Sequence, residues 1–181
     1  TRKAARTLAH TLEHISAERI QAELVKLLIS PYPQYLGTAW ELGLTKIFLP
    51  EFDREMETPQ NNPHHQKNVG EHTLKALEAV EPDKVLRLAA LFHDMGKPDC
   101  RVTDEEGTDH FRGHQKISQE IAQRVLRRLR FDNDTMHKVK TLVYWHECPW
   151  DCTPASVRRA LHKVQPELFP MLLKLRRADI M

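Results

Sequence analysis

The sequence of 181 residues contains no apolar run long enough to cross a bilayer. A run such as LAALF at 88–92 is far too short, because a transmembrane helix needs about 20 apolar residues. The N-terminus also lacks the apolar core of a signal peptide. These absences predict a cytoplasmic protein with no membrane partner.

Cysteine and excess charge are scarce as well. The three cysteines, Cys100, Cys148 and Cys152, are an odd number in a chain too long to need disulfides, which suits a reducing compartment. The 27 lysines and arginines and the 25 aspartates and glutamates leave a net charge of only +2. The whole-chain charge therefore gives no strong case for nucleic acid, and such a case must depend on local patches.

Alternating strand patterns are almost absent, and the dominant hydrophobic period is helical. Apolar residues recur at spacings of three and four in the ranges 4–15, 17–29, 69–80, 83–95, 115–129, 134–147, 154–164 and 167–180. Helix starts are expected at Ser16, at Pro82, at Asn133 or Asp134, and at Thr153. The sequence thus predicts an all-α fold with one core.

Two segments interrupt the helical pattern. The segment PEFDREMETPQNNPHHQKN at 50–68 has no period and three prolines, which predicts a surface loop. The segment CRVTDEEGTDHF at 100–111 predicts a small β-hairpin. The expected layout is a helical lead-in over 1–50, a loop over 51–68 and a helical domain over 69–181. Because the chain begins without Met, we expect a piece of a longer protein.

Four of the eleven histidines share a helical stripe with apolar residues, which predicts that they point into the core. They are His72, His93, His114 and His146. Asp179 shares an apolar stripe on the last helix, which predicts that it also points into the core. By this test the histidines on polar faces are His10, His14, His137 and His162. Scattered buried groups of this kind would be costly, whereas imidazoles and carboxylates gathered around divalent cations would compensate one another.

The stretch LRLAALFHDMGKPDC at 86–100 places His93 and Asp94 side by side. Neighbouring helix residues diverge by about 100°, so both can face one site only near the end of the helix, where GKP interrupts it. A carboxylate has two oxygens and can bridge two metals, which makes Asp94 the candidate bridge. Lys97 follows one turn after His93 and could reach a phosphate.

Other interpretations stay open at this point. His72 and His146 could bond backbone carbonyls, while Asp94 could pair with Lys97 or Arg101. The segment HECPWDC at 146–152 has thiol and imidazole spacing that zinc could use, but no fourth ligand is obvious, so two ordinary reduced cysteines are favoured.

Basic stretches offer a different class of function, which is RNA binding. The residues concerned are Arg124, Arg127 and Arg128 in RVLRRLR, Arg158 and Arg159, and KLRR at 174–177. Such faces are usually only solvated.

The order His72, His93-Asp94, His114, His146, Asp179 resembles that of the HD superfamily of metal-dependent phosphohydrolases. LAALFHDMGKP resembles the central motif of that family closely, and the resemblance covers about residues 66–181. It implies an HD-type helical bundle with one small hairpin.

The whole chain also resembles the C-terminal half of bacterial tRNA nucleotidyltransferases, the CCA-adding enzymes and related poly(A) polymerases that carry an HD domain. The stretches at 15–52 and DHFRGHQKISQEIA at 109–122 carry this likeness. A glycine-serine motif followed by paired aspartates is missing, and so is a Glu-Asp-x-x-Arg motif. The chain alone is therefore not expected to add nucleotides.

The resemblance implies one metal site, held by His72, His93, Asp94 and Asp179. His114 and His146, with Asp94 as the bridge, could hold a second metal, so one or two divalent metal ions are expected. Two cations could activate water for attack on phosphorus, with Asp94 as a catalytic residue and with Lys97 and Arg112 offsetting phosphoryl charge.

The expected function is metal-dependent hydrolysis of phosphomonoesters or phosphodiesters in nucleotides or RNA ends. The alternative is a tRNA-binding body module with a structural or vestigial metal site. Iron, manganese, nickel, cobalt, zinc and magnesium stay open as the metal, because such ligand sets accept all of them.

Overall fold

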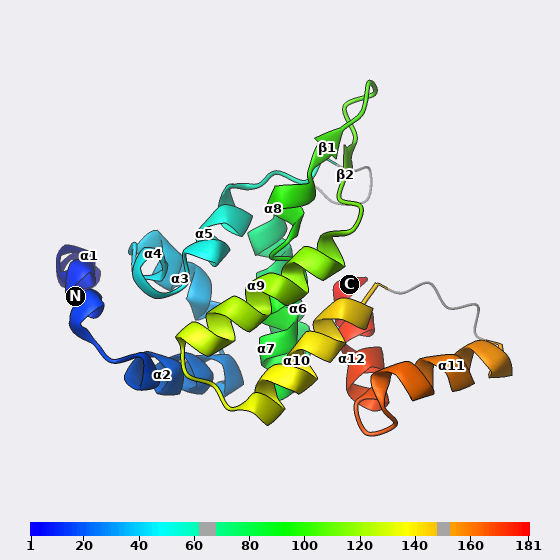
Figure 1. The fold of residues 1–181 in the computed structure, drawn as a ribbon. Coiled ribbons are helices and arrows are strands. Elements are labelled where there is room, and N and C mark those ends of the chain that lie inside the picture. Colours follow the sequence, from blue (N-terminus) through cyan, green and yellow to red (C-terminus); the bar gives the residue numbers. More distant parts are fainter. Residues whose placement is uncertain (62–67, 148–152) are drawn as a thin grey trace.

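The computed structural model shows a helical bundle with one small hairpin (Figure 1). It describes residues 1–61, 68–147 and 153–181. The elements in chain order are α1 (Arg2–Leu8), the 3-10 helix η1 (Ala9–His14), α2 (Ala17–Ile29), α3 (Tyr35–Glu41), α4 (Thr45–Phe48), α5 (Pro50–Glu57), α6 (Val69–Ala79), α7 (Lys84–Phe92), α8 (Lys97–Cys100), β1 (Val102–Thr103), β2 (Asp109–His110), α9 (His114–Arg128), α10 (Asn133–Trp145), α11 (Pro154–Val164) and α12 (Phe169–Asp179). The predicted all-α fold is confirmed. None of the described helices is long and apolar enough to cross a membrane.

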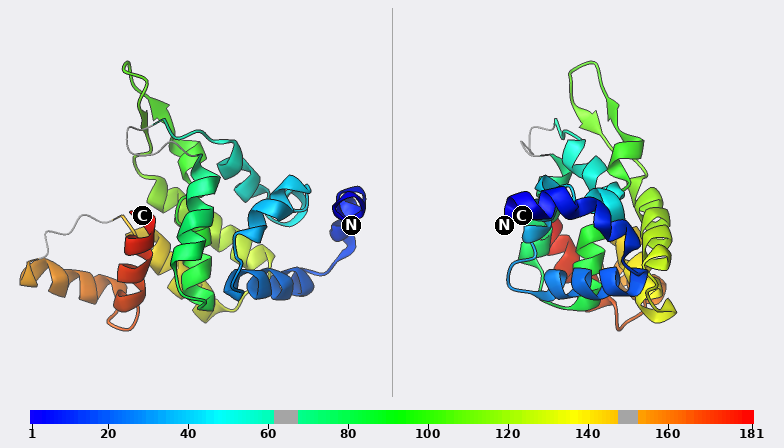
Figure 2. Two further views of the ribbon diagram at one scale, coloured as in Figure 1. Left: turned by 180° about the vertical axis from the view of Figure 1, so that it is seen from behind. Right: turned by 90° about the vertical axis from the view of Figure 1, so that its left-hand side faces the viewer.

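Helix α7 forms the centre of the bundle. Every residue from Leu86 to Phe92 is buried, because the helix is surrounded by α2, α6, α9, α10 and α12. Two views show α9 and α10 side by side on one side of α7 and α6 on the other (Figures 1 and 2). A helix covered all round needs apolar residues all round, which the LRLAALF stretch supplies at every position but Arg87, whose Nε donates to the Glu81 carbonyl. The residues that follow Phe92 therefore emerge in the middle of the molecule.

Side-chain caps fix several helix starts. Ser16 and Thr153 cap α2 and α11 as predicted. Two other predicted starts are wrong by one or two residues. Asp83 rather than Pro82 caps α7, and Asp132 rather than Asn133 or Asp134 caps α10. In each case the aspartate carboxylate accepts a hydrogen bond from the backbone N–H three residues later, which satisfies a helix donor that would otherwise have no partner.

The predicted loop over 51–68 is wrong in its first part, because Pro50–Glu57 forms α5. Pro50 suits the first turn, where a missing N–H removes no helical bond. The helix showed no hydrophobic period because carboxylates stand beside Phe52 among its buried residues. Since α5 packs against both α4 and α6, the lead-in continues directly into the bundle. Residues 62–67 of the predicted loop lie outside the described residues.

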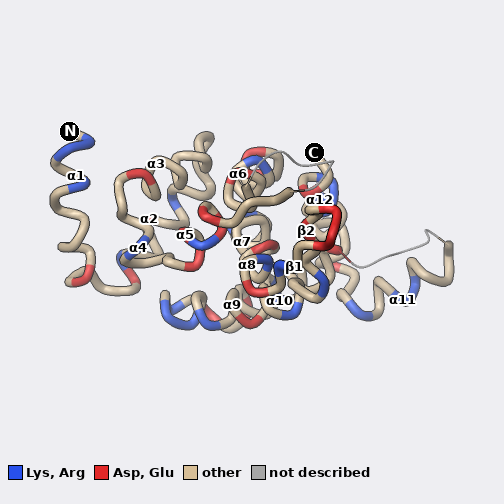
Figure 3. Tube along the Cα trace, turned by 90° about the horizontal axis from the view of Figure 1, so that it is seen from above, with Lys and Arg blue, Asp and Glu red and all other residues tan. Residues whose placement is uncertain are grey.

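The predicted hairpin is confirmed by the antiparallel pairing of β1 with β2. Its turn carries a run of acidic residues, Asp104, Glu105 and Glu106, which stand out in Figure 3. The base of the hairpin is held by Asp109, which is buried. Its carboxylate accepts hydrogen bonds from the Thr103 hydroxyl at 2.6 Å and the Asn61 N–H at 2.9 Å, and Arg101 lies 3.0 Å away. Through Asn61, these bonds tie the hairpin to the segment that follows α5.

Candidate metal centre

The segment after α7 packs closely against α9, and Gly96 permits this close contact. A Cβ atom at Gly96 would lie 2.5 Å from the carbonyl oxygen of His114 and 2.6 Å from the backbone nitrogen of Ser118, both in α9. The N–H of Gly96 donates to the Ser118 hydroxyl at 2.8 Å. Only glycine allows so close a backbone approach. It brings Asp94 next to the first residue of α9.

The six predicted ligands, which belong to separate parts of the chain, meet in one place. They are His72 in α6, His93 and Asp94 after α7, His114 at the start of α9, His146 after α10 and Asp179 at the end of α12. The four histidines have exposed fractions of 0–7% and Asp94 of 1%, while Asp179 is partly exposed. The four histidines predicted to lie on polar faces are all exposed. The helical stripe thus separated inward from outward histidines correctly.

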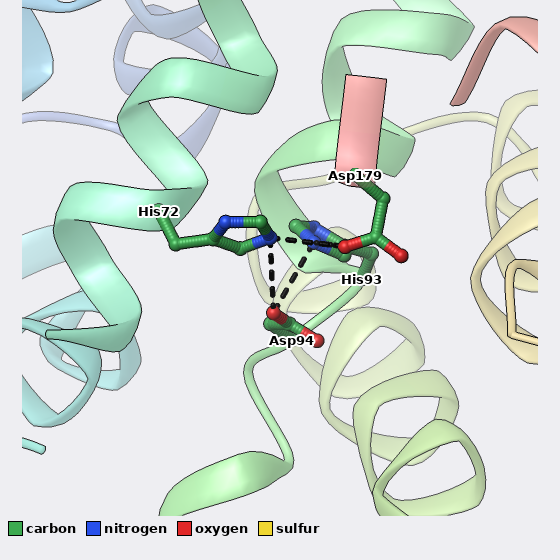
Figure 4. A group of neighbouring side chains, drawn as sticks. All are labelled: His72, His93, Asp94 and Asp179. Atoms are coloured by element: carbon green, nitrogen blue, oxygen red, sulfur yellow. Dashed lines mark hydrogen bonds and ion pairs between the residues drawn. The ribbon is translucent and has the colours of Figure 1, made fainter. Parts of the chain in front are cut away.

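Four of these residues form a first group, shown in Figure 4. The Nε2 atom of His72 lies 2.9 Å from Asp179 Oδ1 and 3.6 Å from Asp94 Oδ2. The Nε2 atom of His93 lies 3.3 Å and 3.2 Å from the same two oxygens. Two imidazole nitrogens and two carboxylate oxygens therefore face a common point.

A second group shares Asp94 with the first. The Nε2 atoms of His114 and His146 lie 3.2 Å and 3.8 Å from Asp94 Oδ1, the oxygen that the first group does not use. The two Nε2 atoms are 3.3 Å apart. Asp94 thus presents a different oxygen to each group, which is the arrangement that a carboxylate bridging two cations requires.

Backbone carbonyls orient three of the rings. The Nδ1 atoms of His93, His114 and His146 lie 2.7–2.8 Å from the carbonyl oxygens of Ala90, Phe111 and Val143. A carbonyl only accepts, so each Nδ1 must carry the proton. In a neutral ring the Nε2 lone pair then points into the cluster, as in many metal-binding histidines. The carbonyl bond considered for His146 is present, and it leaves the other nitrogen available to a ligand.

Several buried polar atoms of the cluster depend on charged partners. His93 Nε2 and both Asp94 oxygens are buried; Asp94 Oδ2 has the Lys97 ammonium 2.7 Å away, whereas within the described residues no lysine or arginine reaches Asp94 Oδ1. Buried polar atoms are normally satisfied. The ligand atoms of each group lie within 4.8 Å of one another, and imidazole with carboxylate suits borderline divalent metals. The six residues therefore fit one or two divalent cations.

Lys97 supplies a charge of its own to the cluster. Its Nζ atom lies 2.7 Å from Asp94 Oδ2, so the pairing of Asp94 with Lys97 considered above is present. Arg101 pairs with Asp109 instead. Although burial disfavours the ammonium, Asp94 raises the pKa of Lys97 above its ordinary value.

Protonation differs between the two groups. Burial and the charge of His93 lower the pKa of His146 to about 4, so that its ring is neutral at pH 7. Burial also disfavours a charged His93, but Asp94 and Asp179 outweigh it and raise the pKa of His93 well above its ordinary value. Metal binding must displace the proton that His93 holds.

A surface depression of about 270 Å³ opens beside the second group. It is lined by Gln60, Lys97, Asp109, His110, Phe111, Arg112, His114 and Glu147. Both residues predicted to bind substrate, Lys97 and Arg112, belong to this wall. Sequence analysis missed Gln60 and Glu147. Glu147 directly follows His146, which was a usable signal, whereas nothing in the aperiodic segment pointed to Gln60.

A further carboxyl, that of Glu55, was missed because α5 was not predicted. Glu55 is fully buried and accepts a hydrogen bond from the Thr73 hydroxyl at 3.2 Å. Burial and the nearby charge of Asp94 raise the pKa of Glu55 well above its ordinary value. Burial thus favours the neutral form of this carboxyl behind the cluster. Cys148 and Cys152 of the considered zinc site lie outside the described residues.

Comparisons with known proteins match two parts of the chain. Residues 64–179 match the family described as HD domain. Residues 1–56 match the family described as probable RNA and SrmB-binding site of polymerase A.

Similar proteins match most of this chain. A CC-adding tRNA nucleotidyltransferase of Thermus thermophilus is 37% identical over 94% of this chain and 41% of its own length. An A-adding tRNA nucleotidyltransferase of Deinococcus radiodurans is 34% identical over 90% of this chain and 38% of its own. A multifunctional CCA protein of Actinobacillus pleuropneumoniae is 32% identical over 71% of this chain and 33% of its own length. The chain thus spans about two fifths or less of the length of these relatives.

Proposed function

We propose, from the premise that the chain belongs to the HD domain family, that it is a metal-dependent phosphohydrolase. Its substrates would be phosphomonoesters or phosphodiesters of nucleotides or RNA ends. The observation that carries the proposal is Asp94, which offers one oxygen to His72 and His93 and the other to His114 and His146. A shared carboxylate between two ligand groups supports a two-cation site.

The chemistry divides between cations and protein. Bound divalent cations activate water and stabilise charge on a phosphoryl group. Asp94 would orient the attacking water, because it lies between the two groups. Lys97 and Arg112 would bind the phosphoryl oxygens, since both line the depression beside His114. Asp94 holds the Lys97 ammonium in place, so this cation is oriented before substrate arrives.

A second candidate function is tRNA binding. It is favoured by the match of residues 1–56 to an RNA-binding family and by relatives whose names specify tRNA. The two functions are compatible, because the metal cluster lies within 68–179 and the RNA-binding match precedes it. If the chain binds tRNA, it would either present RNA to the metal cluster for hydrolysis, or bind RNA while the cluster only stabilises the fold.

Elemental analysis and hydrolysis assays test the first proposal. We expect up to two divalent cations per chain and hydrolysis of bis-p-nitrophenyl phosphate or nucleoside monophosphates when manganese, nickel, cobalt, zinc, iron or magnesium is supplied. Asp94→Asn should lose both cations and at least 100-fold in turnover, while His146→Ala should lose one cation.

The control is Asp134→Asn, an exposed carboxylate of α10 that pairs with Lys138. It should keep full metal content and full turnover. Full turnover in Asp94→Asn would contradict the proposed hydrolysis. Metal binding without hydrolysis of any of these esters would leave tRNA binding as the function.

A further inference from the structure

A basic depression lies at the C-terminal end of α9, away from the metal centre. It has a volume of about 630 Å³. Its walls are formed by Glu120, Gln123, Arg124, Arg127, Arg128 and Arg130. We call this feature the α9 basin. Figure 3 shows the basic residues along this end of α9.

Only one of the four arginines of the α9 basin is neutralised. Arg128 binds Glu51 through both its NH groups at 2.8 Å and also donates to the Phe48 carbonyl. Within the described part of the chain, Arg124, Arg127 and Arg130 form no ion pair, and all three are exposed. Their positive charge is therefore available to an outside anion.

The neighbouring helix adds to this charge. Lys140 of α10 donates to the side-chain oxygen of Gln123 at 2.5 Å. Because Gln123 is neutral, the lysine keeps its charge beside the basin. Glu120 is the one carboxylate in the wall, and three free guanidinium groups outnumber it. The basin thus has a net positive charge.

Arg130 occupies a backbone conformation that does not suit it. Its φ is 62°, in the left-handed region that follows many helices and that glycine or asparagine usually occupies. A non-glycine residue there costs about 1–2 kcal/mol relative to an ordinary conformation. Residues held in such conformations are concentrated at functional sites. Glycine would suit position 130 best, yet the chain has Arg130 there, whose long cationic side chain lines the basin.

We propose that the α9 basin binds the phosphate backbone of RNA. Arg124 and Arg127 lie about one turn apart on α9, and Arg130 follows just past the end of the helix, so the three guanidinium groups are spread along this end of α9, which suits successive phosphates better than a single one. Each guanidinium group can donate two parallel hydrogen bonds to the oxygens of one phosphate.

Continuity with the lead-in also favours RNA. The Arg128–Glu51 pair joins the basin wall to α5, within the segment that matches an RNA-binding family. The proposal rests on tRNA binding as a function of this chain and names the surface that performs it.

Affinity for a fluorescent tRNA transcript, measured against salt, tests this proposal. Each lost phosphate contact lowers the slope of log K against log[salt] by about 0.7–0.9. This corresponds to about five- to eightfold weaker binding at 0.1 M salt for Arg127→Gln and for Arg130→Gly. The Arg130→Gly variant should also unfold at an equal or higher temperature, by up to about 4 °C, because glycine suits φ of 62°. A structural role for Arg130 cannot give higher stability together with weaker binding.

Two controls match these variants. Gln165→Gly relieves a second non-glycine residue with positive φ, at 74°, in the turn before α12, and should leave tRNA affinity unchanged. Arg158→Gln removes one charge from α11, which lies at the other end of the molecule from the basin (Figure 1), and should also leave it unchanged.

Three results would overturn the proposal. The first is an unchanged tRNA affinity in Arg127→Gln and Arg130→Gly, and the second is an equal loss of tRNA affinity in Arg158→Gln. The third is retention of the wild-type chain on anionic vesicles but not on tRNA. Hydrolysis of bis-p-nitrophenyl phosphate by the same variants should stay at the wild-type level. Failure of the basin is therefore distinguishable from failure of the metal centre.

Discussion

Substituting Gly96 by alanine should disturb both the fold and one half of the metal centre. The added Cβ would lie 2.5 Å and 2.6 Å from backbone atoms of His114 and Ser118. Backbone atoms of a packed helix cannot swing aside as a side-chain end can. The segment after α7 and helix α9 must therefore move apart, and this displaces His114 from Asp94, now 3.2 Å away.

The size of the effect follows from three contributions. Overpacking costs about 1–3 kcal/mol, and weakening the bond from Gly96 N–H to the Ser118 hydroxyl costs about 1 kcal/mol more. Alanine restricts the unfolded chain and returns about 0.4–1 kcal/mol. The net loss is about 1–3.6 kcal/mol, which at this chain length lowers the midpoint of thermal unfolding by about 2–14 °C.

Thermal unfolding and elemental analysis together check this prediction. Gly96→Ala should unfold earlier and lose the cation of the second group, while the group of His72, His93 and Asp179 keeps its own. The control is Gly37→Ala, whose Cβ would meet only the end of the Leu74 side chain, at 2.9 Å. If Gly96→Ala matched this control in both measurements, the close approach of α9 would not be what positions His114.

Two further predictions concern stability. Removing the cap in Asp132→Ala should destabilise the protein by about 1 kcal/mol at pH 7, while Asn133→Ala should change little. Hydrogen bonds from Thr135 lower the pKa of Asp132 to about 2. The difference in free energy of unfolding between Asp132→Ala and the wild type should therefore be present above about pH 4 and vanish as the pH falls toward 2. Denaturant titrations across this range measure the difference, and one that persists at pH 2 would contradict the cap. Chelation should lower the unfolding midpoint and added cation restore it, since a ligand at 100 times its Kd stabilises the folded state by about 2.7 kcal/mol. The midpoint of Asp94→Asn should not respond, and an unresponsive wild type would show that the chain holds no cation.

The inward side chains of the metal centre could be predicted because they lie on regular helices or directly after a helix end. His72 and His146 occupy the same stripe as apolar residues, and a period of 3.6 fixes the direction of each side chain once the helix is recognised. The ring distances could not be predicted in this way. They depend on how α6, α9, α10 and α12 are placed around α7, which tertiary packing decides.

Features that depend on contacts between residues far apart in the chain could not be predicted from the sequence. Helix α5 was missed because its buried face carries Glu51 and Glu55 and so shows no hydrophobic period; these carboxylates are buried against Arg128 and Thr73. Arg128 is 77 residues from Glu51, so nothing local showed that it was unavailable to RNA. Arg130 gave no signal, because residue type does not report a left-handed φ.

The ligands of the metal centre come from parts of the chain that are far apart, and this sets an order of events during folding. His72 and Asp179 are separated by 107 residues, and only His93 and Asp94 are neighbours. Closing loops of this length is entropically unfavourable until other contacts form, so no short peptide from this chain can assemble either group. Metal uptake by the group of His72, His93, Asp94 and Asp179 must therefore follow the docking of α12, and a cation bound there in turn holds the last helix to the bundle. The rate at which the protein acquires metal would report when its topology is complete.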